Sequence, residues 1–334
     1  MALTHLVEGL LIGVLATGVF LGSVPLARAA DAPGAAAARI ARWKDDKKAA
    51  FTLAFDDSTP SQVKNAVPEL KKRGLVGTFY INAGAGHYNK EAWEKEIPLT
   101  GMEYGNHTFT HVGARDVAHL EEELAKANEA IARCFPDRKT PRLISFGRPG
   151  VKPGAWAVTE DQLKPLLAKY NLVERPPFNG AAIHLKTAED MTRLVDTALA
   201  KGTLEHIDFH GVGGDWLSAP LPDFITLLDK LVSVRDRLWI TDPISVHKYE
   251  TERDGAELKV LESGPKQVRL SLACKANPAL YDLPLTLVVP VPAAWQQCTV
   301  AQGAQMTTAT AAGGAVTFPA LPGADEITIR PAEK

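Results

Sequence analysis

The stretch FTLAFDDSTP, residues 51–60, is an apolar run that ends in two adjacent carboxylates, Asp56 and Asp57. Neighbouring side chains on a strand point to opposite faces, and like charges repel. A second acid beside the first therefore needs a physical reason. A helix cap would account for one of the acids but hardly for both. We expect a strand over 51–56 that ends here, so that the two acids can turn in different directions.

Strand-like and helix-like segments alternate along the chain beyond this stretch. Short runs of apolar and β-branched residues predict strands at 51–56, 76–81, 102–106, 143–147, 205–209 and 238–241. Apolar residues at helical spacing predict helices at 60–73, 117–135, 187–201 and 221–236. Alternation of this kind favours a parallel sheet, either open or closed into a barrel, over residues 48–252.

The pattern changes after about residue 250. Four short β-patterned runs have the sequences QVRLSLAC, LTLVVPV, AVTFPAL and EITIRPA, and Gly, Pro and Ala separate them. We expect a small antiparallel, sandwich-like β domain over residues 253–334. Because these runs contain no row of aromatic residues, the domain is expected to pack on its neighbour rather than to bind a glycan.

The N-terminal segment has the character of an export signal. Residues 1–29 contain a long uncharged apolar run that ends near Ala27-Arg28-Ala29, a small-residue cleavage pattern. We expect residues 30–47 to be a linker outside the fold. No Lys or Arg precedes the apolar run, which leaves an uncleaved membrane anchor as the alternative. Either way the protein is expected to be exported, as a periplasmic or secreted protein.

The composition is that of an ordinary globular protein. The 334 residues are 46% hydrophobic and 23% charged, with a formal net charge of −2. This balance argues against nucleic acid or an anionic membrane as a partner, and nothing points to an obligate protein partner. The cysteines, Cys134, Cys274 and Cys298, are too few for a disulfide scaffold or a Cys-based zinc site. The last two could pair in an oxidising compartment.

Polar side chains follow four of the predicted strands at their carboxyl ends. The two acids end the first strand, NHTFTH (106–111) follows the third, Arg148 follows the fourth and His210 follows the fifth. The carboxyl ends of parallel strands meet at one rim, where active sites are built. We therefore expect these residues to converge on one site.

His107 and His111 are four residues apart, a spacing that places two imidazoles on one face of a helical turn. Two imidazoles and a carboxylate form the ligand set of a catalytic divalent metal, most simply Zn²⁺, with Co²⁺ and Ni²⁺ as further candidates. A magnesium site with both acids as ligands is a weaker alternative, because histidine suits softer ions. A pair of structural histidines is the plainer alternative, and the other polar strand ends argue against it.

The paired acids could divide the work at such a metal. One carboxylate would bind the ion, and the other would take a proton from a water beside it. Arg148 is a suitable partner for an acid that has to stay ionised. His210 is placed to protonate a leaving group, and Asp208 could orient it.

The motifs LAFDD, NHTFTH, RPG and the late FH resemble, in order and approximate spacing, those of the polysaccharide deacetylase family, the NodB-type carbohydrate esterase family 4. The resemblance covers about residues 48–250 and implies a distorted (β/α)7 barrel. It also implies an activity, the removal of acetyl groups from a glycan, with N-acetyl favoured over O-acetyl. The site residues follow by motif: Asp56 as the base, Asp57, His107 and His111 as metal ligands, Arg148 as the residue that holds the base, and His210 as the acid.

The chain departs from the family's pattern at three places. Ser58 stands where the first motif usually continues with Gly. The third motif usually reads Arg-x-Pro-Tyr-Gly, but GRPGVKPG has no Tyr, so an oxyanion would be bound by the backbone N–H of Gly150 or Val151. The Asp-x-x-Asp-Trp motif is absent from 152–204, although GGDW occurs at 213–216. Substrate class is the inference that these departures weaken most.

Two tryptophans, Trp156 and Trp216, lie in loops on the expected active rim. They could stack on a sugar ring or simply anchor their loops. Two other functions stay open, a metal-dependent hydrolase of a small amide on the same barrel and an inactive carbohydrate-binding protein. The export signal and the added β domain favour an acetylated glycan or cell-envelope polysaccharide as the substrate.

Overall fold

The structure is a computed structural model that describes residues 37–333. The expected signal peptide (1–29) and the start of the expected linker lie outside the described residues. Among the residues that are described, no helix is both long enough and apolar enough to cross a membrane.

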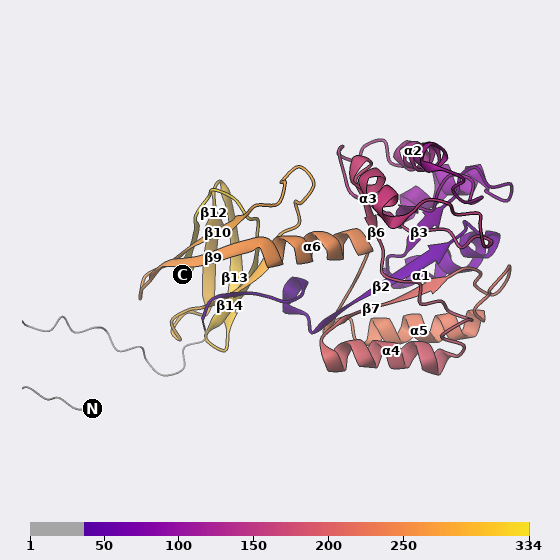
Figure 1. Cartoon of the computed structure of the whole chain (residues 1–334). Coiled ribbons are helices and arrows are strands. Elements are labelled where there is room, and N and C mark those ends of the chain that lie inside the picture. Colours follow the sequence, from indigo (N-terminus) through magenta and orange to yellow (C-terminus); the bar gives the residue numbers. More distant parts are fainter. Residues whose placement is uncertain (1–36, 334) are drawn as a thin grey trace, which may run out of the picture. The chain divides into compact units, whose positions relative to one another are not determined.

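Seven parallel strands form the first part of the fold (Figure 1). They are β2 (Ala49–Asp56), β3 (Thr78–Ile81), β4 (Glu103–Asn106), β5 (Ile144–Phe146), β6 (Leu172–Glu174), β7 (Leu204–Phe209) and β8 (Leu238–Thr241). Their spatial order is β6-β5-β4-β3-β2-β7, and β8 pairs with the first half of β2. The six strands expected in this region are confirmed with small shifts at their ends, and β6 is an additional strand.

The segment after β6 bridges the gap between β6 and β7. Ala181 donates its backbone N–H to the carbonyl O of Asp208 at 2.8 Å, and Asp208 donates its own N–H to the carbonyl O of Asn179 at 3.1 Å. The curved parallel sheet with its helices is therefore a distorted (β/α)7 barrel, as expected.

Helices connect the strands. They are α1 (Val67–Arg73), which continues from a π-helical turn (Gln62–Ala66), α2 (Val117–Cys134), α3 (Glu160–Lys169), α4 (Ala188–Lys201), α5 (Leu221–Ser233) and α6 (Pro243–Gly255), with short helical turns at Lys44–Asp46, Ala92–Glu96 and Ile97–Thr100. Figure 1 shows α4 and α5 side by side along β7. The four expected helices are confirmed, whereas α3 and α6 are additional. The Asp116 side chain caps α2 by accepting the His119 N–H at 2.8 Å.

An aromatic layer packs between the sheet and its helices. The Phe55 ring stacks on Phe79 and Phe209, with centroids 4.6 Å and 5.2 Å away, and meets the edge of Phe224 from α5 at 6.0 Å. Because side chains alternate along a strand, Phe55 on the helix side directs Asp56 to the opposite side of β2. The packing of the aromatic layer thus fixes the strand that carries the paired acids.

An antiparallel all-β region follows α6 and confirms the expected C-terminal β region. Its strands are β9 (Ala256–Ser263), β10 (Val268–Cys274), β11 (Leu285–Pro290), β12 (Gln297–Gln302), β13 (Gln305–Ala312), β14 (Ala315–Ala320) and β15 (Ile327–Pro331). With β1 (Arg39–Ile40) their order is β1-β11-β14-β13-β12-β15-β10-β9. The β13 strand pairs with β12 and then with β14, so it joins the two halves, which bury one apolar cluster. Cys274 and Cys298 are not paired, and all three cysteines are free thiols.

The expected linker is wrong for residues 39–47. Arg39 and Ile40 pair with β11, and Trp43 is only 1% exposed within the apolar cluster of the β region. The Trp43 indole N–H donates to the carbonyl O of Gly202 at 3.1 Å. A two-residue strand and one buried ring leave no periodic pattern in the sequence, so the sequence could not separate this segment from the preceding Ala-rich stretch.

Candidate active site

The turn after β2 separates the two acids. Asp56 is the last residue of β2, and Asp57 and Ser58 follow with φ angles of 74° and 52°. This left-handed conformation costs a non-glycine residue on the order of 1 kcal/mol. It also lets two adjacent carboxylates diverge. Ser58 adopts it although it is not Gly, and its Oγ accepts the Asn82 N–H at 3.3 Å.

Residues 106–111 form a tight turn instead of the helical turn that their spacing favoured. The Asn106 side chain accepts the Thr108 N–H at 2.9 Å, and Thr108 Oγ1 accepts the His111 N–H at 3.3 Å. Thr108 and His111 both have positive φ angles, 60° and 63°. The two imidazoles still lie close together, as expected, with 4.9 Å between the centroids of the His107 and His111 rings.

Asp57, His107 and His111 form one cluster of potential metal ligands. Asp57 Oδ1 lies 3.3 Å from His107 Nε2 and 3.1 Å from His111 Nε2. Atoms that each lie about 2.0–2.1 Å from a tetrahedral Zn²⁺ are about 3.3 Å apart, so these spacings suit that ion. Asp57 Oδ1 is also buried without a hydrogen-bond partner among the described residues, as expected of an oxygen that faces a cation. The cluster therefore fits a divalent metal.

A backbone carbonyl sets the tautomer of His107. Its Nδ1 lies 2.7 Å from the carbonyl O of Gly147, which directly follows β5. Nδ1 therefore carries the proton, and Nε2 presents a lone pair to the cluster. A ligand histidine is usually held in this way through its second nitrogen.

Asp57 and His111 stabilise each other's charged forms. Burial would raise the pKa of Asp57, but the neighbouring imidazoles of His107 and His111 hold it well below the usual range of an aspartate. Burial would lower the pKa of His111, yet the Asp57 carboxylate raises it above its ordinary value. A bound cation would likewise favour the ionised form of Asp57.

Arg175 holds Asp56. Its two terminal nitrogens donate to the two carboxylate oxygens at 2.6 Å each, and Nη1 also lies 3.1 Å from Asp208 Oδ1. Burial would raise the pKa of Asp56, but the charge of Arg175 holds it below its ordinary value. Asp56 is therefore an ionised carboxylate beside the cluster, with Oδ2 4.0 Å from His107 Nε2.

Arg148 does not hold Asp56, and that expectation is corrected. Its guanidinium contacts Glu160 at 2.5 Å, lies 3.8 Å from Glu174 and covers the Trp156 ring. The arginine that holds Asp56 is Arg175, which follows β6. This strand is the neighbour of β5, the strand that precedes Arg148. Because two neighbouring strand ends each carry an arginine, position in the sequence does not tell which one reaches the acid.

His210 lies beside the cluster at the end of β7. Its Nε2 is 3.7 Å from Asp57 Oδ2. Its Nδ1 is buried and has no hydrogen-bond partner within the described part of the chain. Asp208 does not orient it as expected, because that carboxylate contacts Arg175 instead.

A cleft of about 500 Å³ opens onto these groups. It brings together nearly all the expected residues and adds an apolar wall; its lining comprises Asp56, Asp57, His111, Arg148, Gly150, Arg175, Phe178, Ile183, His210, Trp216 and Leu217. Trp216 is 41% exposed there. Trp156 does not line this cleft but packs against the hydrophobic core.

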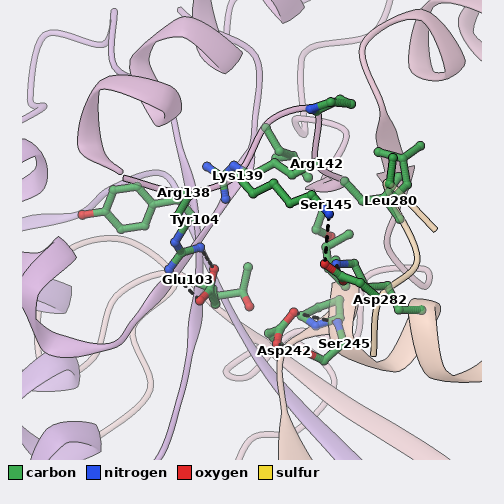
Figure 2. A pocket seen from close by; sticks show the side chains of 18 residues that line it. Glu103, Tyr104, Arg138, Lys139, Arg142, Ser145, Asp242, Ser245, Leu280 and Asp282 are labelled. Carbon is green, nitrogen blue, oxygen red and sulfur yellow. Dashed lines mark hydrogen bonds and ion pairs between the residues drawn. The ribbon is translucent and has the colours of Figure 1, made fainter. Parts of the chain in front are cut away.

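A second cavity, of about 260 Å³, lies at the amino ends of β4 and β5 and offers no comparable chemistry (Figure 2). The carboxylates that line it already have hydrogen-bond or ion-pair partners. Arg138 binds Glu103, and Asp242 caps α6 by accepting the Ser245 N–H. Lys248 Nζ lies 2.6 Å from Asp282. Because no histidine lines this cavity, the catalytic potential lies in the cleft at the carboxyl ends.

Two contributors to the site escape sequence reasoning. Arg175 ends the run LVER (172–175), whose strand is too short to give a β pattern. His87 lies in the loop after β3, and its Nε2 is 2.6 Å from the carbonyl O of Asp57. An arginine directly after a short apolar run was the available signal for the first, whereas nothing in the local pattern marks the second.

The chain is similar to several known proteins over part of its length. A gellan lyase from a Bacillus species is 24% identical over 302 residues, which is 80% of this chain, so the chain spans only 12% of that relative's length. Among solved structures, a family 4 carbohydrate esterase from Streptomyces lividans is 20% identical, with 58% of this chain and 92% of that one covered and a TM-score of 0.41. A peptidoglycan deacetylase from Bacillus subtilis is 16% identical, with 62% and 94% covered and a TM-score of 0.43.

One family model matches the chain itself. Residues 44–158, which include Asp56, Asp57, His107 and His111, match the model for polysaccharide deacetylases. The matched segment ends before Arg175 and His210, the part in which the motifs depart most from the family's pattern. Residues 44–158 therefore resemble the polysaccharide deacetylase family, with low identity to the relatives found.

Proposed function

We propose that the protein is a metal-dependent deacetylase that removes acetyl groups, N-acetyl in preference to O-acetyl, from a carbohydrate or cell-envelope polysaccharide. One observation carries the proposal: the orphan Oδ1 of Asp57 faces His107 and His111, directly beside the ionised Asp56. A family match over residues 44–158 supports the deacetylase class.

The residues of the cleft divide the chemistry. A divalent metal held by Asp57, His107 and His111 would polarise an acetyl carbonyl and lower the pKa of water to about 7. Asp56, kept ionised and oriented by Arg175, would accept the proton of the attacking water. The Gly150 backbone lies at the cleft, and its N–H is our candidate donor to the oxyanion.

His210 would deliver the second proton. It lies on the cleft side of Asp57 and would act as the acid that protonates the departing amine or alcohol. Acetate and the deacetylated sugar are then the products. We propose Zn²⁺ as the resident ion, with Co²⁺ and Ni²⁺ as substitutes, because the donor set is two imidazoles and a carboxylate.

The apolar run in residues 1–29 supports export from the cytoplasm, which would bring the enzyme to glycan substrates outside the cell.

Acetate release from a panel of N- and O-acetylated glycans tests this function. The full-length chain is assayed as purified, after chelation, and after Zn²⁺ is restored. We expect release on at least one glycan that chelation abolishes and the metal restores. Release that chelation leaves unchanged, or none from any glycan or small amide, would contradict the proposal.

A further inference from the structure

The two oxygens of the Asp57 carboxylate have separate partners. Oδ1 faces His107 and His111 and accepts no hydrogen bond from the described residues. Oδ2 accepts a hydrogen bond from the indole N–H of Trp216, with 2.8 Å between nitrogen and oxygen. The indole nitrogen can only donate, so Oδ2 is the acceptor in this hydrogen bond.

The loop that carries Trp216 is tied to the turn that carries Asp57. The Asp215 carboxylate accepts the backbone N–H of Ser61 at 2.6 Å, and Gly211 donates its N–H to the Trp216 carbonyl O at 3.1 Å. On the other side, the His87 ring packs edge-on to Trp216 at 5.1 Å. These contacts hold the Trp216 indole in place beside the Asp57 carboxylate.

We propose that Trp216 is a positioning residue for Asp57: its indole N–H occupies Oδ2 and leaves Oδ1 as the oxygen that binds the metal. Without this bond the carboxylate could rotate about its last torsion and present either oxygen, or both, to the ion. Hydrogen bonds to a metal ligand change metal affinity by about 10- to 100-fold when they are removed. This role differs from sugar stacking, which would use the face of the ring and not its N–H.

Two substitutions separate the N–H from the ring. Trp216→Phe keeps an aromatic ring and removes the donor. Trp216→Gln removes the ring, but its side-chain amide nitrogen lies the same number of bonds from Cα as the indole nitrogen. Trp156→Phe is the matched control, because the Trp156 indole N–H has no hydrogen-bond partner among the described residues.

The test measures Zn²⁺ affinity of the metal-free, full-length chain by competition with a fluorescent chelator. It rests on the proposed metal site but not on any assay of deacetylation. We expect Trp216→Phe to weaken Zn²⁺ binding about 10- to 100-fold, Trp216→Gln to weaken it less, and Trp156→Phe to leave it unchanged. Visible absorption of the Co²⁺-loaded proteins should change in Trp216→Phe as the coordination changes.

Equal affinity in Trp216→Phe and the wild type would overturn the positioning role, as would weaker binding by Trp216→Gln than by Trp216→Phe. A wild type that binds Zn²⁺ but releases no acetate would overturn the proposed function and leave this inference standing. A wild type that binds no metal would overturn both.

Discussion

Asp56 and Asp57 are adjacent in the chain but have different partners. Asp57 turns toward two imidazoles, and Asp56 turns toward the Arg175 guanidinium. A regular strand would also direct the two acids apart, but it would place Asp57 in the helix layer. The positive φ of Asp57 turns its side chain away from that layer, so both acids can reach the site. Different surroundings at neighbouring positions allow two identical side chains to do different chemistry.

Arg175 and Arg148 give a prediction at the residue scale. Arg175→Met leaves Asp56 and Asp208 buried without their cation, so we expect a loss of about 3–5 kcal/mol in the free energy of unfolding. Arg148→Met breaks a half-exposed pair with Glu160 and should cost about 0–1 kcal/mol. Denaturant titration of both variants checks the order, and equal losses would contradict it.

The same variant has a pH signature. Burial raises the pKa of Asp56 and Arg175 lowers it, so removal of Arg175 should raise that pKa. In whatever fraction folds, the acidic limb of the activity profile should therefore move to higher pH. An unmoved acidic limb in Arg175→Met would show that another group controls it.

At this scale the sequence predicts the cluster of Asp57, His107 and His111 but not the residues that support it. His107 and His111 are found because their spacing and the nearby acids point to one chemistry. Arg175 is missed because the short run before it gives only a weak signal, and nothing in that run links it to Asp56, 119 positions away. Arg148 is misassigned because the sequence supplies strand ends but not the reach of each side chain.

At the scale of elements, strongly periodic segments are predicted well and short ones are not. The helix expected at 117–135 is found at Val117–Cys134, because an apolar stripe runs along its whole length. Strands of two or three residues, such as β1 and β6, have no room for a pattern. The α3 helix contains Pro165, which obscures its start, although Thr159 and Gln162 form a capping box.

A substitution of Trp43 tests whether β1 and the short helical turn after it belong to the fold. Its ring is buried in the β-region cluster and its N–H is hydrogen-bonded, so Trp43→Ala should lower the free energy of unfolding by about 3–5 kcal/mol. A chain that begins at residue 48 should lose at least as much. Thermal unfolding measures both, and a variant as stable as the wild type would restore the linker interpretation for this segment.

At the scale of the whole described chain, two apolar clusters organise the fold. One lies between the parallel sheet and its helices, and the other fills the β region and includes Ala50, Trp239 and Tyr249, which all precede residue 252. The predicted boundary near residue 252 therefore marks a change of secondary structure and not a gap in packing. Hydrophobic patterns identify each region, whereas contacts between distant segments are not visible in them.

Glu252, on α6, makes the stability depend on pH. It is 2% exposed, and burial raises its pKa to about 7, while Oε2 accepts the Leu283 N–H. Between the unfolded-state pKa of 4.5 and about 7 the folded chain holds the extra proton. Protonated Glu252 makes the free energy of unfolding about 3 kcal/mol larger than ionised Glu252 does. This stabilisation is complete below pH 4.5 and is lost as the pH rises to about 7.

Glu252→Gln tests this directly, because the amide keeps the size and the acceptor oxygen. The variant should match the wild type near pH 4.5 and be more stable at pH 8, as measured by denaturant titration at both values. A difference between the two proteins that stays constant with pH would contradict the raised pKa.

Metal content and turnover of Asp56→Asn and Asp57→Asn, measured side by side, test the central claim most directly. The account predicts that Asp56→Asn binds Zn²⁺ as the wild type does but releases acetate at least about 10²-fold more slowly. It predicts that Asp57→Asn loses both the metal and the activity. Retained turnover in Asp56→Asn, or wild-type Zn²⁺ binding in Asp57→Asn, would contradict the division of roles between the two acids.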